Sequence, residues 1–181
     1  MSTLRGQLLI ASPALIDPNF HRTVVLIAEH DDSGAMGVVL NRPSELAVAE
    51  AASVLGDLVE AGEVVHEGGP VQPTAVVILA EFDSADAAAV PVFGEVGFVS
   101  GEADFETLGP GIRRARVFAG LAGWAPGQLE AELERDDWVL DTARADDVFT
   151  GVPDALWGEV LERKGGSFAL LARMPPDPSL N

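Results

Sequence analysis

The chain contains no cysteine and no tyrosine. Without cysteine it has no disulfide framework, no thiolate ligand for a metal and no cysteine nucleophile. Long hydrophobic runs are also missing, because no apolar stretch approaches the roughly 18 residues of a membrane helix. The first residues lack the basic segment and apolar core of a signal peptide. We therefore expect a cytoplasmic protein with no membrane partner.

Positive charge is scarce. Eleven Lys and Arg residues stand against 29 Asp and Glu residues, which gives a formal net charge of −18. A charge of this sign repels phosphate backbones and anionic membranes. The one basic cluster is Arg113, Arg114 and Arg116, and on a strand only Arg114 and Arg116 share a face. A solvated strand is favoured over a nucleic-acid patch, so we expect no nucleic-acid partner.

Hydrophobic residues make up 48% of the 181 residues, enough for a substantial buried core. The length predicts a single domain over residues 1–181, with residues 173–181 as a frayed tail. Residues 23–28 form a β-branched apolar run, typical of a strand buried on both faces, and residues 35–40 return as its hairpin partner. The remaining pattern predicts further strands in hairpin succession and three main helices, over residues 45–59, 126–134 and 153–163. This order favours an α+β fold with a mixed, mostly antiparallel sheet.

The most informative segment runs F-A-G-L-A-G-W-A-P-G-Q from Phe118 to Gln128. A strand leads into a glycine-rich bend, and a helix is predicted to open at Pro126. Such corners often carry sites, because a helix N-terminus offers free N–H groups and a positive dipole end. Trp124 and Gln128 are candidate ligand contacts. The alternatives are a core position for Trp124 and a backbone hydrogen bond for the Gln128 amide.

Other candidates follow strands elsewhere. Arg42, in N-R-P, is predicted between a buried strand and a helix, where its guanidinium could bind a carboxylate or phosphate of a ligand, or pair with an acid of this chain. The segment E-G-G-P-V could form an anion-binding nest, or it could be a turn that needs a positive φ. His30 precedes two aspartates, but the three histidines lack the spacing of a metal site, so a hairpin-capping role is favoured and no metal or cofactor is predicted. The residues predicted to line one ligand cleft are His30, Asn41, Arg42, Gly68, Gly69, Trp124 and Gln128.

Five segments together resemble the YqgE/AlgH family of bacterial proteins. They are G-Q-L-L-I-A-S-P from Gly6, F-H-R-T-V-V-L-I-A-E-H from Phe20, G-A-M-G-V-V-L-N-R-P from Gly34, G-G-P-V from Gly68 and G-L-A-G-W-A-P-G-Q-L-E from Gly120. The resemblance implies a strongly bent, partly closed mixed sheet with helices packed against it. It implies no established activity, although some members bear the label of transcriptional regulator. The chain departs from the family at Leu121, where the family usually has tyrosine.

The favoured function is a non-enzymatic binding or regulatory module whose cleft takes a small anion-bearing ligand or a protein segment. The alternative is an enzyme of unknown reaction acting on a small anionic substrate, with His30 or Glu67 as acid–base candidates. The sequence contains neither the G-x-S-x-G elbow of a serine hydrolase nor a phosphate-binding P-loop. A DNA-binding transcriptional regulator is the least favoured reading, because the chain is acidic and shows no helix-turn-helix pattern. The oligomeric state is left open.

Overall fold

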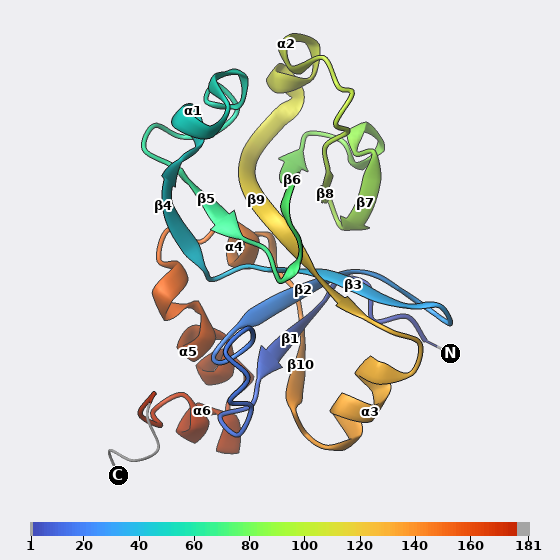
Figure 1. Cartoon of the computed structure of the whole chain (residues 1–181), viewed down its shortest axis with the longest axis vertical. Coiled ribbons are helices and arrows are strands. Elements are labelled where there is room, and N and C mark those ends of the chain that lie inside the picture. The colour runs from blue at the N-terminus through green and yellow to red at the C-terminus, as the bar shows by residue number, and fades with distance from the viewer. Residues whose placement is uncertain (1, 177–181) are drawn as a thin grey trace.

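Apolar strands build a ten-stranded, mostly antiparallel sheet (Figure 1). The computed structural model describes residues 2–176. The strands are β1 (Gln7–Ala11), β2 (Val24–Asp31), β3 (Gly34–Val39), β4 (Pro43–Ala47), β5 (Val64–Glu67), β6 (Val71–Phe82), β7 (Val90–Phe93), β8 (Val96–Phe98), β9 (Ile112–Trp124) and β10 (Trp138–Thr142). The main path runs β10-β1-β2-β3-β9-β6-β8-β7 and does not close into a barrel. The predicted α+β class and the mostly antiparallel sheet are confirmed.

The long strand β9 joins the two halves of the sheet. One end of β9 pairs with β3 and the rest pairs with β6, and β9 curves visibly between them (Figure 1). The strand β5 runs parallel to β9, and β4 pairs antiparallel with β5. This side branch, β4-β5, lies off the main path and carries the cleft described below.

The first strands are buried on both faces, as their continuous apolar runs predict. Every residue of the run Val24–Ala28 has no exposed surface. In β1, Leu8 and Ile10 belong to one core cluster and Leu9 to another. Helix α5 (Pro153–Lys164) packs into the first cluster and α3 (Gln128–Glu134) into the second, so the two helices cover opposite faces of the sheet.

The helix predicted over residues 45–59 is wrong. Its place is taken by β4, a single turn α1 (Val48–Ala51) and a 3-10 turn, Ser53–Leu55. The alanine-rich spacing suits a helix, but pairing with β5 overrides it. Ser44, the predicted N-cap, donates its hydroxyl to the Val65 carbonyl instead, at 2.6 Å.

The other helices are short or shifted. Helix α3 begins at Gln128 rather than Pro126, because Gly127 holds a left-handed φ of 77°. The remaining helices are α2 (Phe105–Leu108), α4 (Ala145–Val148) and α6 (Ser167–Leu171). Further 3-10 turns are Ala85–Ala87 and Gly109–Gly111. Residues 177–181 of the predicted frayed tail lie outside the described residues, and no helix within residues 2–176 is long and apolar enough to cross a membrane.

Candidate functional site

The glycines of the two most prominent motifs pack against each other. A Cβ on Gly120 would lie 2.3 Å from the Gly69 carbonyl oxygen, and one on Gly68 would lie 2.2 Å from the Gly120 carbonyl oxygen. The Gly68 N–H donates to Ala119, and the Gly68 carbonyl accepts from Val39. Gly68 therefore offers no free N–H to an anion. These glycines allow two backbones to approach within a distance that no side chain permits.

The side chains of the corner bind one another through Glu132. Its Oε2 accepts the indole N–H groups of Trp124 and Trp138 at 2.9 and 2.8 Å, and its Oε1 accepts the Gln128 amide at 2.9 Å. The side-chain Oε1 of Gln128 also accepts the Ala125 N–H. Trp124 is 6% exposed and belongs to the core beneath α3. Trp124 is therefore a core residue, and the Gln128 side chain bonds the backbone and Glu132, as the alternatives to ligand contact state.

His30 and Asn41 are also occupied within the chain. The Nε2 of His30 lies 2.7 Å from Glu130 on α3, and its Nδ1 accepts the Leu4 N–H. The Asn41 amide accepts the Val24 N–H and donates to the Arg22 carbonyl, which fixes the start of β2. Within residues 2–176, no group of three or more His, Asp or Glu side chains is placed to hold a metal.

A cleft of about 380 Å³ lies over the β4-β5 branch. Its floor follows strand alternation: Arg42, Ser44 and Leu46 are two residues apart and share one face, as do Val65 and Glu67 of β5. Ala119 of β9 continues the floor. The rest of the lining comes from Asn19, Val39 of β3, Gly69 and Pro70 of the β5–β6 connection, and Pro73 of β6. Of the predicted cleft residues, the structure brings Arg42 and Gly69 together here, whereas His30, Trp124 and Gln128 lie around α3.

Arg42 is the half-buried cation of this cleft. Its Nη2 donates to the His21 carbonyl at 3.1 Å. No carboxylate of residues 2–176 forms an ion pair with it, although the chain holds 29 acidic residues. Arg5 and Arg22 also donate to carbonyls. Arg42 differs from them in combining an unpaired guanidinium with a place in the cleft.

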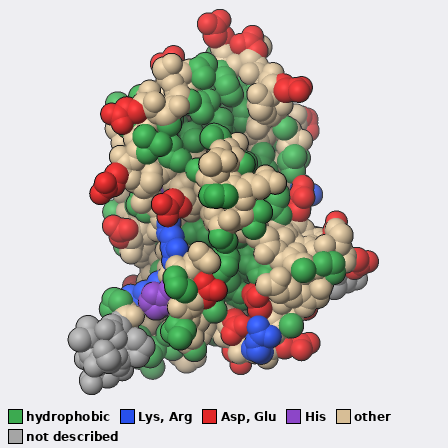
Figure 2. All heavy atoms as spheres, viewed as in Figure 1, with side chains coloured by type: hydrophobic (Ala, Val, Ile, Leu, Met, Phe, Trp, Pro, Cys, Tyr) green, Lys and Arg blue, Asp and Glu red, His purple; other side chains and the backbone are tan. Residues whose placement is uncertain are grey.

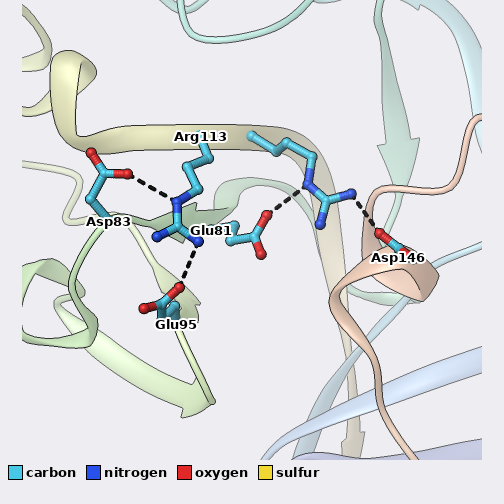
Figure 3. Close-up of polar contacts among 6 residues, drawn as sticks. Glu81, Asp83, Glu95, Arg113 and Asp146 are labelled. Carbon is cyan, nitrogen blue, oxygen red and sulfur yellow. Dashed lines mark hydrogen bonds and ion pairs between the residues drawn. The ribbon is translucent and has the colours of Figure 1, made fainter.

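The arginine cluster of β9 is neutralised by acids of the same chain. Figure 3 shows Arg113 between Asp83 and Glu95, at 2.9 and 2.7 Å, and the neighbouring Arg114 bridges Glu81 and Asp146. Arg116 is 5% exposed, binds Glu63, and donates to the carbonyls of Val148 and Thr150. These pairs occupy all three arginines of β9, and the buried Arg116 departs from the expectation of a solvated strand.

His66 is a buried histidine that the sequence pattern did not single out. It lies on β5 with 2% exposure, its ring is tilted against Phe118, and its Nε2 has no hydrogen-bond partner. Burial, and next the nearby positive charge of Arg116, lower the pKa of His66 from its ordinary value of 6.5. The neutral form is therefore the one that the folded chain accommodates.

We expect this histidine to weaken the fold in mild acid. The unfolded chain takes up the proton below about pH 6.5, whereas the folded chain resists it, so the stabilisation is complete above that pH and is lost as the pH falls. The slope contributed by one proton is at most about 1.4 kcal/mol per pH unit. Urea unfolding of the wild type and His66→Leu at pH 7.5, 6.5 and 5.5 measures it. His21→Gln serves as the control, and equal slopes for the wild type and His66→Leu would contradict the prediction.

Comparison with known proteins places the chain in a family. The model of the AlgH-like family matches residues 8–169. A UPF0301 protein from Streptomyces coelicolor is 43% identical, over 100% of this chain and 97% of that protein. A UPF0301 protein from Mycobacterium tuberculosis is 42% identical, over 97% of this chain and 90% of its own length.

Two solved structures share the fold. A protein from Corynebacterium diphtheriae superposes with a TM-score of 0.87 and 32% identity, covering 96% of this chain and 94% of that chain. The solution structure of the AlgH protein from Pseudomonas aeruginosa gives a TM-score of 0.71 and 31% identity, over 97% of both chains. The chain belongs to the YqgE/AlgH family.

Proposed function

We propose that this chain is a non-enzymatic binding module, in which the cleft over β4 and β5 takes a small ligand through an anionic group held by Arg42. One observation carries the proposal: a half-buried arginine in a cleft has no carboxylate partner within residues 2–176 of a chain rich in acids. A guanidinium presents a planar fork of donors that matches carboxylate and phosphate oxygens. A regulatory role would act through this ligand, and the cytoplasm is its proposed location.

The walls of the cleft suit the apolar part of a small molecule. Its volume lies within the roughly 300–1,000 Å³ range of small-ligand sites, and such sites combine apolar walls with few polar groups. Leu46 lines the cleft and is 47% exposed, so it offers apolar surface to a ligand. On the face seen in Figure 2, hydrophobic side chains gather in the upper half, and acidic side chains surround them.

The enzymatic alternative has weaker support. Of its two acid–base candidates, Glu67 lines the cleft, whereas His30 lies beside α3 and pairs with Glu130. General acid–base catalysis needs its groups within hydrogen-bonding reach of one substrate. The cleft supplies one carboxylate and one guanidinium, an arrangement that favours binding.

A thermal-shift screen tests the proposal. The probes are inorganic phosphate, nucleotides, phosphorylated sugars and small carboxylic acids, with α-amino acids among the last. A probe at about 100 times its Kd raises the free energy of unfolding by about 2.7 kcal/mol, a shift of several degrees for a chain of this size. We expect at least one of these probes to give this shift in the wild type and to lose it in Arg42→Gln.

The control is Arg135→Gln, which removes an exposed arginine paired with Asp137 beyond α3. This variant should respond as the wild type does. The proposal is wrong if every probe leaves the melting temperature unchanged, or if the shift persists in Arg42→Gln.

A further inference from the structure

The cleft holds a second charge directly across the ladder from Arg42. Pro43 of β4 lies opposite His66 of β5, and this antiparallel register places Arg42 opposite Glu67. The Glu67 N–H donates to the Arg42 carbonyl at 2.8 Å, which confirms that the two residues are neighbours. Both side chains line the same cleft.

These two opposite charges do not pair with each other. Directly opposed cross-strand residues have Cβ atoms about 4.5–5.5 Å apart, and opposite charges there usually attract. Arg42 instead turns to the His21 carbonyl, and the exposed Glu67 carboxylate forms no ion pair with any residue of 2–176. The cleft therefore presents a cation and an anion side by side, each available to a ligand.

A ligand with only negative charge fits this pair poorly. It would be attracted to Arg42 but repelled by Glu67 a few ångströms away, and by the field of a chain with net charge −18. A ligand that also carries an ammonium group turns the repulsion from Glu67 into attraction. The neighbouring charges thus favour a zwitterion over a simple anion.

The apolar floor supplies the remaining specificity. Leu46 of β4 is 47% exposed and supplies most of the accessible apolar surface, whereas Val65 of β5 is 6% exposed. Ala119 of β9 also lines the cleft and pairs with Glu67 of β5, and its partner on the other side, Val76 of β6, is 59% exposed. An aliphatic side chain attached close to the charged groups would cover this surface.

We infer that the cleft binds a zwitterion with an apolar side chain, of the class of the aliphatic α-amino acids. The ligand carboxylate binds Arg42, the ammonium group binds Glu67, and the aliphatic group packs chiefly on Leu46. This inference rests on the proposed function, because it takes the same cleft and the same role for Arg42. It adds Glu67 as a specificity-determining residue.

Isothermal titration with three related probes tests the inference. L-Leucine carries both charges, isocaproate lacks the ammonium group, and isoamylamine lacks the carboxylate. We expect wild-type protein to bind leucine about tenfold or more tightly than either analogue, because each lost charge removes a charge-assisted hydrogen bond. In Glu67→Gln, leucine and isocaproate should bind with similar affinity.

Two arginine variants complete the test. Arg42→Gln should weaken leucine and isocaproate together, whereas Arg42→Lys, which keeps the charge, should retain part of the binding. Far-UV circular dichroism and melting temperature verify that each variant is folded, and Arg135→Gln is the matched control.

The outcomes separate the inference from the proposed function. Equal binding of leucine and isocaproate by the wild type, with no effect of Glu67→Gln, overturns the zwitterion and leaves anion binding at Arg42 in place. If only phosphate compounds bind, and Arg42→Gln abolishes that binding, the zwitterion is likewise excluded and anion binding at Arg42 remains. If no probe of either series binds, both the inference and the proposed function fall.

Discussion

Gly120→Ala is expected to cost the fold more than about 4 kcal/mol, a loss found only for a short list of structural defects. Gly120 has a φ of +83°, and its Cβ would meet the Gly69 carbonyl oxygen at 2.3 Å and the Pro73 Cα at 3.2 Å. The left-handed conformation alone costs an alanine roughly 1–2 kcal/mol. The overlap adds to this, because both neighbours are backbone atoms and must move. Urea unfolding followed by tryptophan fluorescence measures the loss.

Gly127→Ala is the matched control. Its φ is +77°, so it shares the conformational cost, but nothing lies within 4 Å of the added Cβ. We expect a loss of only about 1–2 kcal/mol there. Similar losses for the two variants would show that the close approach of the two backbones is unimportant.

Glu132→Ala is expected to lower the free energy of unfolding by roughly 3–5 kcal/mol. The carboxylate accepts three N–H groups, two of them from the buried indoles of Trp124 and Trp138. Each buried donor left without a partner costs about 1–3 kcal/mol. Phe20 contacts both indole rings, at centroid distances of 6.0 and 5.6 Å, so the near-UV circular dichroism of this aromatic cluster should also change.

Glu134→Ala controls for helix and charge effects. Glu134 lies on the same helix, is exposed, and makes no side-chain hydrogen bond within residues 2–176. Its removal should change stability by less than about 0.5 kcal/mol. If Glu132→Ala lowers the free energy of unfolding by no more than this, the indole N–H groups donate to water in the variant and the prediction is wrong.

The sequence predicts the strands well because their signal is local. Residues 24–28 are apolar without a break and rich in β-branched side chains, which is typical of a strand covered on both faces. The failed helix over residues 45–59 has the opposite origin. Its alanine-rich pattern favours a helix weakly, and the pairing of Pro43 and Ala47 with β5 is a contact that no local pattern contains.

Because residues 45–59 are expected to be helical, the sequence does not predict the strand that lines the cleft. With residues 45–59 assigned to a helix, Leu46 falls on a helical face, and the alternation of Arg42, Ser44 and Leu46 along a strand is not seen. Arg42 itself could be found from the scarcity of basic residues. The corner pattern points to Trp124 and Gln128 but not to their partner Glu132, although Gln128 and Glu132 lie four residues apart on α3, which is a contact spacing on a helix.

The most direct test of the binding proposal is an NMR titration of the ¹⁵N-labelled protein with L-leucine and, separately, isocaproate. The predicted result is that L-leucine shifts the amide signals of Glu67 and Gly69 and the side-chain Nε–H signal of Arg42 in a saturable way, and that isocaproate does so only at higher concentration. The indole N–H signals of Trp124 and Trp138 should stay in place, because Glu132 occupies them. Shifts of the indole and α3 signals, with the cleft signals unchanged, would contradict the proposal and would place the binding site at the glycine-rich corner.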